Sequence, residues 1–366
     1  EEFNINDLAL SWKKNNYDIS VLTMVPSYPD SNIAEGYKNK FYQKDEWRGI
    51  TIHRIKTVRG YKNSLLKKIL RYVWFMVAGS IFAIIFGKKY DYVFGFNGGA
   101  LSSMLPATLI CKIFKKPTTL WVQDIWPDSI YAYGFKKTKI RAFFINKFVE
   151  FIYKNINNIA VSSKGFPTIL KSFTKRNQIF HYLPNWPIDL KMNTKPIKLS
   201  ETEKVHLTFA GNLGKVQNLE KIILSFNQLS DKYSKKAQLN IIGNGSELEA
   251  LKLINKKSNV IFHGQKPRKD MMKYFNASNF LIVSLINMPI FSKTVPAKLQ
   301  TYIAAKKPIL AIIKGEASNI VKDNKLGYVA NPDDINNIKM IFMQAIDAKK
   351  NVMKSFIRNC EKLTQN

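Results

Sequence analysis

Residues 205–215 read VHLTFAGNLGK and place a strand-like run directly before a glycine-rich turn. The first six of these residues include β-branched and aromatic side chains, which favour a strand, and a helix is predicted from about Asn218. A strand that leads through a turn into a helix is typical of a parallel α/β domain. Gly211 and Gly214 allow the backbone to approach an anion, and Lys215 can neutralise its charge, although an ordinary tight turn has the same composition.

The alternation of strand and helix continues toward the carboxyl end of the chain. Strand-like runs are separated by segments with helical periodicity, and Gly, Pro, Asn and Ser gather at the connections. The predicted strands are 205–210, 237–242, 260–262, 280–285 and 308–313, and the predicted helices include 269–275, a helix from 297, and 318–323, with a loop at 286–296. This order predicts a doubly wound parallel sheet.

A similar set of elements precedes this one. Residues 3–16 read as an amphipathic helix, and the predicted strands are 17–24, 49–55, 90–96, 118–122, 158–161 and 179–183. Residues 189–204 are polar and rich in lysine, which is typical of a linker. We therefore expect an N-terminal domain at 1–190, a linker at 191–204 and a C-terminal domain at 205–366. An α/β domain normally opens on a strand, so the helical start predicts that a first strand and its glycine loop are missing.

Positive charge is concentrated in the middle of the chain. The chain has 57 Lys and Arg against 26 Asp and Glu, and residues 51–200 hold 25 of the basic side chains but only 5 of the acidic ones. Such a field implies an anionic partner: nucleic acid, acidic lipid headgroups or a phosphorylated substrate. An AT-rich gene, which inflates lysine without function, is the alternative. The two cysteines fit neither a disulfide framework nor a zinc site, which favours the cytoplasm.

Two segments of the N-terminal domain combine apolar and basic residues. Residues 72–86 are almost wholly apolar between flanking lysines and arginine, and residues 136–154 mix phenylalanines with lysine and arginine. The apolar run extends about 24 Å, which is shorter than the hydrocarbon core of about 30 Å, so we expect no membrane span. A buried core helix and a helix that lies on the bilayer surface both remain open. Two such segments favour a membrane surface as a partner.

Two further turns of the C-terminal domain are candidates for phosphate binding. Residues 243–246 read GNGS after a predicted strand, a pattern that an ordinary αβ turn shares. Residues 294–298 read TVPAK, and Pro296 stands near a predicted helix start. We expect the N–H groups of residues 297–299 to be free for an anion. Lys298 in the first turn opposes the helix dipole, so a bound anion is one interpretation and a solvated surface lysine the other.

The order of these pieces resembles glycosyltransferase family 4, whose members have the GT-B fold: two doubly wound Rossmann-like domains that face each other across a cleft. The resemblance covers roughly residues 1–340. The matching segments of the C-terminal domain are VHLTFAGNL (205–213), NIIGNGSEL (240–248), NVIFHG (259–264), AAKKPILA (304–311), NIV (319–321), GYV (327–329) and PDD (332–334). The resemblance also implies that the chain ends before the family's last crossover helix.

Segments of both domains are similar to a narrower subgroup, which includes the bacterial L-fucosamine transferases of O-antigen and capsule assembly. These segments are EEFNINDLA (1–9), WVQDIWPDS (121–129), LPNW (183–186) and TVPAKL (294–299). The resemblance implies a retaining hexosyltransferase that uses a nucleotide-diphosphate sugar, UDP-linked in our interpretation, and a polyprenyl-diphosphate-linked saccharide acceptor. It implies a peripheral protein on the inner face of the bacterial plasma membrane.

The resemblance and the turns together give a candidate site. Lys215 and Lys298 would bind the departing diphosphate, and Asp124 and Gln123 would orient the acceptor or the sugar. The expected donor-binding residues are Gly211, Asn212, Gly214, Gly243, Gly245, Glu247, Gly264, Gln265, Lys293, Thr294, Val295, Pro296 and Ala297. No Asp-x-Asp pair occurs, so we expect neither a bound metal nor another cofactor. The alternative for Asp124 is a helix N-cap or a hydrogen-bonding role in the Trp-Pro turn.

Two departures from the family pattern leave other functions open. Many relatives carry two glutamates where Lys293 and Thr301 stand, and many carry a histidine where Gln123 stands. The first change leaves the donor sugar undefined. The alternatives are a GT-B sugar-nucleotide epimerase, an inactive binding partner, and a basic nucleic-acid-binding protein. Against the last, the aromatic residues lie in apolar stripes and no nucleic-acid-binding motif is present, so we expect no nucleic acid partner.

Overall fold

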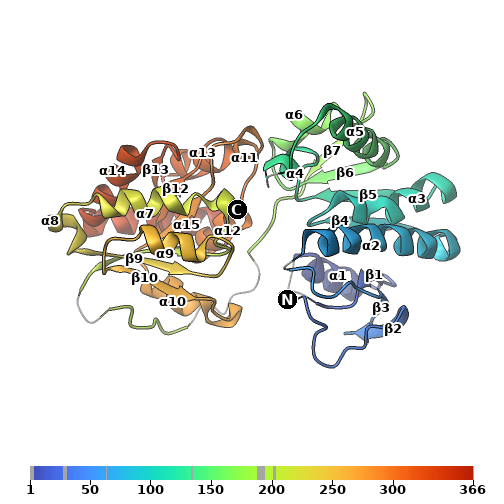
Figure 1. Ribbon diagram of the computed structural model, residues 1–366, viewed down its shortest axis with the longest axis horizontal. Coiled ribbons are helices and arrows are strands. Elements are labelled where there is room, and N and C mark those ends of the chain that lie inside the picture. The colour runs from blue at the N-terminus through green and yellow to red at the C-terminus, as the bar shows by residue number, and fades with distance from the viewer. Residues whose placement is uncertain are drawn as a thin grey trace. The chain divides into compact units, whose positions relative to one another are not determined.

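A computed structural model describes residues 4–27, 31–62, 64–132, 135–187, 194–200 and 203–365 (Figure 1). Residues 1–3, and residues 191–193 and 201–202 of the predicted linker, lie outside the described residues. The chain divides into two compact units, which we call the first and the second unit. The first consists of Glu1–Tyr131, Lys136–Ser162 and Phe166–Pro184, and the second of Ala132–Phe135, Ser163–Gly165 and Asn185–Asn366. The domain bounds given from the sequence stay a prediction.

The second unit is built on one parallel sheet. Its strands are β8 (Val205–Ala210), β9 (Ala237–Ile242), β10 (Val260–Gly264), β11 (Phe280–Ser284), β12 (Ile309–Ile312) and β13 (Gly327–Ala330). Their order is β10-β9-β8-β11-β12-β13, so the winding direction reverses between β8 and β11. In such sheets ligands bind at the carboxyl ends of the strands, at the point where the winding reverses. Five of the six strands were predicted from the sequence.

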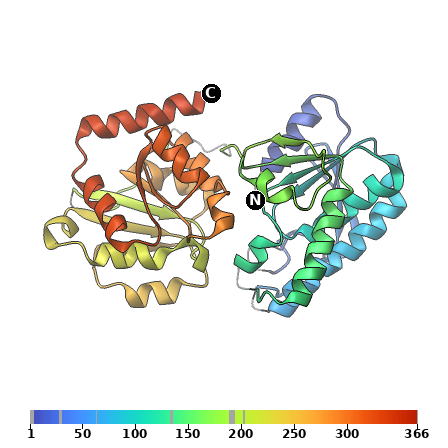
Figure 2. The same ribbon diagram turned by 90° about the horizontal axis from the view of Figure 1, so that it is seen from above.

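Helices cover both faces of this sheet, as Figure 2 shows. They are η3 (Lys215–Gln217), α7 (Leu219–Asn227), α8 (Asp231–Ser234), α9 (Leu248–Ile254), η4 (Arg268–Asp270), α10 (Met271–Ala277), α11 (Pro289–Ser292), α12 (Ala297–Ala304), α13 (Glu316–Asp323), α14 (Ile335–Ile346) and α15 (Lys350–Gln365). Every residue of β9 and β11 is buried, as expected for parallel strands covered on both sides. The predicted loop at 286–296 was wrong in part, because α11 forms within it.

The first unit contains two sheets. The strands β4 (Val93–Asn97), β5 (Thr118–Val122), β6 (Asn158–Val161) and β7 (Phe180–Tyr182) form a parallel sheet in that order. The strands β1 (Ser20–Met24), β2 (Tyr42–Trp47) and β3 (Ile50–Ile55) form the other sheet in the order β1-β3-β2. The sequence prediction missed β2, which is antiparallel to β3. Arg48 and Gly49 connect the two strands with φ angles of 50° and 78°, as a two-residue hairpin turn requires.

The helices of residues 4–184 include one long apolar helix. They are α1 (Asn4–Lys14), α2 (Leu65–Phe86), η1 (Gly87–Lys89), η2 (Leu101–Met104), α3 (Leu105–Phe114), α4 (Asp128–Ala132), α5 (Lys139–Lys154) and α6 (Phe166–Leu170). The side chain of Ser64 caps α2 by accepting a hydrogen bond from the N–H of Lys67. One face of α2 packs against α3, and a Cβ atom added at Gly79 would lie 2.8 Å from Cγ of Pro106.

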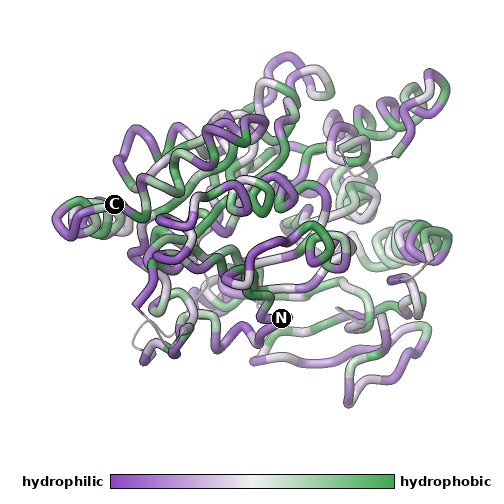
Figure 3. The backbone as a smooth tube through the Cα atoms, turned by 60° about the vertical axis from the view of Figure 1, so that its left-hand side comes forward, coloured by the Kyte–Doolittle hydropathy of each residue, from purple (hydrophilic) through white to green (hydrophobic). Residues whose placement is uncertain are grey.

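The length of α2 corrects the estimate made from the sequence. The helix has 22 residues and therefore extends about 33 Å, which is enough to cross a bilayer. Most residues of α2 are apolar, and Figure 3 colours hydrophobic residues green along the backbone. Residues 65–89 are long and apolar enough for a membrane span, but Phe75, Ala78, Gly79, Phe82 and Ala83 are buried within the unit. While these contacts hold, only the opposite face of α2 is available to lipid.

Candidate active site

Two glycine-containing loops interlock at the carboxyl ends of β8 and β9. The N–H of Gly211 donates to the carbonyl of Ile242 (2.9 Å), and the N–H of Leu213 donates to the carbonyl of Asn244 (3.0 Å). Gly211 and Gly243 have φ angles of 146° and 144°. A Cβ atom at Gly243 would lie 1.8 Å from the carbonyl oxygen of Gly211, and one at Gly245 would lie 2.4 Å from that of Leu213. These glycines are therefore required by the packing of one loop on the other.

Replacing Gly243 with alanine should lower the free energy of unfolding by about 3 kcal/mol or more, because the clash is with backbone and the φ angle is unfavourable. Gly264 is the matched control: its φ is +67°, but nothing lies within 4 Å of the added Cβ atom. Gly264→Ala should cost only about 1–2 kcal/mol. Chemical denaturation of both variants gives the comparison, and equal losses would contradict the interlocked packing of the two loops.

The side chain of Lys298 lies beside the first of these loops. Its Nζ atom is 4.0 Å from the centre of the Phe209 ring, and a Cβ atom at Gly211 would lie 2.9 Å from that Nζ atom. The residue is partly exposed, yet its ammonium group is largely removed from water, and this burial lowers its pKa to about 7. In the part of the chain that the structure describes, no carboxylate or carbonyl pairs with it. The interpretation as a solvated surface lysine is therefore wrong.

The turn before α12 differs from the prediction in one respect. Pro296 caps the helix, but the N–H of Leu299 donates to the carbonyl of Pro296 (2.9 Å), so it is not free for an anion. Of the three N–H groups predicted to bind an anion, those of Ala297 and Lys298 are left to do so. Val295 is buried, and the hydroxyl of Thr294 donates to the carbonyl of Ile290 (2.9 Å). Thr294 and Val295 thus hold the turn in place.

The other predicted donor-binding residues differ in their exposure and in their hydrogen bonds. Asn212 and Lys215 are exposed, and Gln265 is exposed beyond β10. The N–H of Gly214 donates to the side chain of Gln217 (3.2 Å), and the N–H of Glu247 donates to the carbonyl of Leu213 (2.9 Å). The structure therefore brings Gly211, Gly243, Gly245 and Lys298 together. Lys215 lies on η3, shortly after Gly211 in the sequence, and Lys293 is exposed after α11.

The sequence prediction missed Glu316 at the start of α13. Its carboxylate accepts hydrogen bonds from the hydroxyl of Ser163 (2.7 Å) and from the N–H groups of Lys164 (2.9 Å) and Gly165 (2.8 Å). The carbonyl of Lys293 accepts from the same serine hydroxyl (2.5 Å). All these residues belong to the second unit. A glutamate 151–153 positions from its partners leaves no local sequence signal, which is why sequence reasoning overlooked it.

A second group of polar residues lies at the carboxyl ends of β4 and β5 in the first unit. Asn97 is fully buried, its side-chain amide donates to the carbonyl of Asp124 (3.2 Å), and the N–H of Gln123 donates to the carbonyl of Asn97 (3.2 Å). Burial raises the pKa of the Asp124 carboxyl to about 6. Burial, and then the charge of Asp124, raises the pKa of the nearby Tyr153. The hydrogen bonds of Asn97 therefore hold the backbone of Gln123 and Asp124 at the strand ends.

The carboxylate of Asp124 is a candidate ligand-binding group. Of the residues that the structure describes, none donates a hydrogen bond to its carboxylate oxygens, so the alternative of a helix N-cap finds no support. A carboxyl group whose pKa is about 6 can hold or release a proton near neutral pH. Within the same described ranges, no group of three His, Cys, Asp or Glu side chains is arranged to hold a metal ion.

Comparisons with known proteins indicate the family to which this chain is similar. Residues 191–363 match the family described as "Glycosyl transferases group 1". The chain is 24% identical over 293 residues to the probable glycosyltransferase WbjE of Pseudomonas aeruginosa, covering 76% of this chain and 72% of that protein. It is 25% identical over 233 residues to the putative colanic acid biosynthesis glycosyl transferase WcaI of Escherichia coli K12, covering 59% of this chain and 56% of the relative.

A solved structure supports the same fold. Sucrose-phosphate synthase from Thermosynechococcus elongatus superposes with a TM-score of 0.72 at 14% identity, covering 99% of this chain and 87% of that one. Identity this low shows the fold alone, and it confirms the prediction of two Rossmann-like domains. On the family match, the two relatives and the fold, the chain is a glycosyltransferase of the GT-B fold, and its residues 191–363 are similar to the family described as glycosyl transferases group 1.

Proposed function

We propose that this glycosyltransferase moves a sugar, with retention of configuration, from a UDP-linked donor to a polyprenyl-diphosphate-linked saccharide. The donor sugar is an N-acetylated deoxyhexosamine such as N-acetyl-L-fucosamine. The reaction belongs to the assembly of a surface polysaccharide such as O-antigen or capsule. The name of WcaI, which refers to colanic acid biosynthesis, supports the polysaccharide part of this proposal. The subgroup resemblance of residues 121–129 and 294–299 supports the sugar.

The observation that carries the proposal is the position of the Lys298 ammonium beside Gly211. A buried ammonium with no carboxylate partner in the described chain is an electrostatic site for a dianionic group. It lies where the winding of a parallel sheet reverses, which is the usual place for a nucleotide. We assign it to the donor diphosphate, whose negative charge grows as the bond to the sugar breaks. Lys215 and the N–H groups of Ala297 and Lys298 add to this site.

Proton transfer in this proposal needs no separate base on the donor side. In a same-face displacement the oxygen of the acceptor hydroxyl attacks the anomeric carbon while the bond from that carbon to the diphosphate oxygen breaks, and the departing diphosphate oxygen accepts the hydroxyl proton. Asp124, with a pKa of about 6, then orients the acceptor hydroxyl through its carboxylate. Gln123 assists as a neutral hydrogen-bonding group. Because cations and N–H groups stabilise the diphosphate, we propose that the reaction proceeds without a metal ion or other cofactor.

Lys293 and Thr301 distinguish this chain from many relatives. Lys293 is exposed and Thr301 is half-buried, and the hydroxyl of Thr301 donates to the carbonyl of Ala297 within its own helix (3.3 Å). A cation and a hydroxyl replace two carboxylates, so the donor sugar meets a different set of groups. We propose that this difference selects the sugar.

The first unit carries the features that support a lipid-linked acceptor. α2 exposes apolar side chains between basic ends, and α5 exposes Ile140, Phe143 and Phe144 beside lysines and an arginine. We propose that these helices bind the inner face of the bacterial plasma membrane, where a lipid-linked acceptor is found. The protein is then cytoplasmic and peripheral, and nucleic acid is not its partner.

A panel of nucleotide sugars tests the donor. A sugar nucleotide present at about 100 times its dissociation constant should stabilise the protein by about 2.7 kcal/mol and raise its melting temperature by about 5 °C or more. UDP-N-acetyl-L-fucosamine should give the largest shift, and GDP- or TDP-linked sugars little or none. The proposal fails in its donor if a non-uridine nucleotide stabilises most. Conversion of the donor without any acceptor, followed by NMR, would instead indicate an epimerase.

A further inference from the structure

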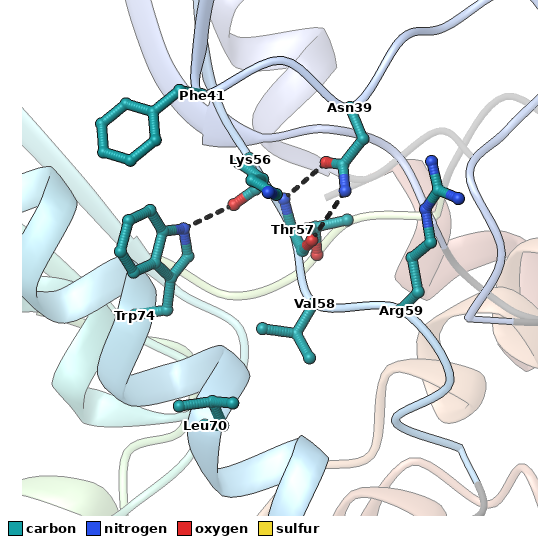
Figure 4. Close-up of a pocket in the computed structure, with 8 residues that line it drawn as sticks. All are labelled: Asn39, Phe41, Lys56, Thr57, Val58, Arg59, Leu70 and Trp74. Carbon is teal, nitrogen blue, oxygen red and sulfur yellow. Dashed lines mark hydrogen bonds between the residues drawn. The ribbon is translucent and has the colours of Figure 1, made fainter.

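A pocket of the first unit lies beside α2. Its volume is about 550 Å³, which is within the usual range of ligand-binding pockets. The segment 56–59 after β3, the segment 39–41 and one face of α2 form its walls (Figure 4). The lining residues are Asn39, Phe41, Lys56, Thr57, Val58, Arg59, Leu70 and Trp74.

One side of the pocket is aromatic and apolar. The rings of Phe41 and Trp74 meet edge to face at 5.2 Å, and Figure 4 shows them together on one side. The indole N–H of Trp74 donates to the carbonyl of Lys56 (2.8 Å), which fixes the ring. Phe41 is 68% exposed and Leu70 is 52% exposed, so this side is an apolar surface that faces solvent.

The other side is cationic. Lys56 and Arg59 are exposed, no acidic residue lines the pocket, and neither cation forms an ion pair within the described residues. Arg71 of α2 contacts the same segment. Its Nε donates to the hydroxyl of Thr57 (3.3 Å), and its guanidinium stacks over the ring of Tyr61 at 4.5 Å. Asn39 and the backbone of Thr57 hold each other through two hydrogen bonds of 2.9 and 3.0 Å. The backbone that carries Lys56 and Arg59 is therefore held in place, and neither side chain has an ion-pair partner among the described residues.

The apolar side of the pocket continues along the exposed face of α2, which we call the α2 stripe. Its members recur three or four residues apart and are 43–75% exposed: Leu66, Leu70, Val73, Val77, Ile81 and Ile84. Leu70 belongs to both the pocket and the stripe. The stripe extends for about 27 Å along the helix. Acidic residues are absent from α2, and Lys67, Lys68 and Lys88 lie near its ends.

We propose that this pocket and the α2 stripe form the binding site for the lipid part of the acceptor. Lys56 and Arg59 bind the diphosphate, Phe41 and Trp74 cover the first isoprenoid units, and the polyprenyl chain lies along the stripe. The argument is the juxtaposition of two unpaired cations with a long exposed apolar face that share Leu70. A soluble anion would leave the stripe uncovered, and a neutral lipid would leave the cations unpaired. This inference rests on the lipid-linked acceptor proposed above.

Binding to vesicles tests the pocket without any enzymatic step. The probes are phosphatidylcholine vesicles alone, the same vesicles with phosphatidylglycerol, and the same vesicles with polyprenyl diphosphate. The double variant Lys56→Ala with Arg59→Ala should bind the polyprenyl diphosphate vesicles about 10-fold or more weakly, because two charge-assisted contacts are lost. The control Lys14→Ala with Arg176→Ala removes the same two charge types from exposed positions of the same unit, outside the pocket, and should leave this binding nearly unchanged.

The phosphatidylglycerol arm separates a specific site from general attraction. Binding to these vesicles should fall equally, and only slightly, in the two double variants. An equal loss on both kinds of anionic vesicle, or no loss on polyprenyl diphosphate, overturns the proposal. Leu70→Asn should weaken binding to polyprenyl diphosphate as well, because it interrupts the stripe where the pocket meets it. Melting temperatures of all variants establish that each is folded.

A transfer assay distinguishes failure of this site from failure of the proposed function. With a lipid-linked saccharide the Lys56→Ala, Arg59→Ala variant should show a raised KM and a nearly unchanged kcat, while a water-soluble acceptor without the lipid should give an unchanged KM. If the wild-type protein transfers sugar to the lipid-linked acceptor and the variant has the same KM, the pocket is excluded and the function stands. If vesicle binding follows the prediction but no transfer occurs, the function fails and the site stands.

Discussion

Replacing Lys298 with methionine should lower kcat by about 100- to 1000-fold, the usual effect of removing one electrostatic group from a developing negative charge. The ammonium of Lys298 lies beside Gly211 at the carboxyl edge of the second-unit sheet, where we place the donor diphosphate. Methionine keeps the length and the apolar stem, so packing over Phe209 is largely retained. Steady-state kinetics with the preferred donor measures the effect, and Lys298→Arg should recover part of it.

The same substitution should stabilise the protein at neutral pH. Burial lowers the pKa of Lys298 to about 7, so folding disfavours the charged form. The resulting decrease in the free energy of unfolding is fully present below pH 7 and disappears as the pH rises toward the ordinary pKa of lysine. Lys298→Met should therefore raise the free energy of unfolding by about 2 kcal/mol at pH 6, after allowance for partial exposure, and by nearly nothing above pH 10.

Lys307 provides the matched control for this prediction. Burial lowers its pKa as well, but its Nζ donates to the carbonyls of Asn276 (2.9 Å) and Ser278 (3.0 Å). Lys307→Met would leave these carbonyls without their donor, so it should destabilise the protein while kcat changes little. An active and destabilised Lys298→Met variant would show that Lys298 is a structural residue like Lys307.

Asp124→Asn should lower kcat by about 100-fold and remove the acidic limb of the pH profile. Because the pKa of Asp124 is about 6, the wild-type rate should rise through pH 6 as the carboxylate forms. The raised pKa also means that the ionised form destabilises the fold. This cost grows as the pH rises from about 4 to 6 and is then constant, so Asp124→Asn should be more stable than wild type by about 2 kcal/mol at pH 7 and no more stable at pH 4.

Asp128 is the control for Asp124, because it is exposed in the first turn of α4. Asp128→Asn should keep the activity and its pH profile, and it should not stabilise the protein at pH 7. The rate and the unfolding free energy are measured at the same pH values for both variants. An acidic limb that persists near pH 6 in Asp124→Asn would assign that limb to another group and contradict the role given to Asp124.

The sequence predicts the parallel core well because its strands are short apolar runs bounded by turns. β9 and β11 are buried on both faces, and a continuous apolar run is the pattern that such strands require. β2 escaped prediction because YQKDEW is polar and only every second residue is partly covered, as at a sheet edge. β13 is only four residues long, and a run so short does not stand out in the sequence. The hairpin turn at Arg48 was missed because arginine is uncommon at a positive φ.

The local sequence pattern predicted the turns of the candidate site but not the directions in which their side chains point. Sequence spacing placed Lys298 in the first turn of a helix, yet whether it lay in water or over Phe209 depended on residues about 90 positions away. The hydrogen bond from Leu299 to Pro296 likewise depended on the detailed turn geometry. Asp124 was recognised by its motif, but its raised pKa comes from burial that only the folded first unit creates.

The interlocked glycine loops have a consequence for how nucleotide affinity arises. Since the loops after β8 and β9 share hydrogen bonds and touch at their glycines, neither can shift without the other. A diphosphate that binds at the proposed site would therefore meet a preorganised surface, and little conformational entropy would be lost there on binding. Substitutions elsewhere in the proposed site can then change which sugar is accepted, while the two loops hold the departing diphosphate in the same position.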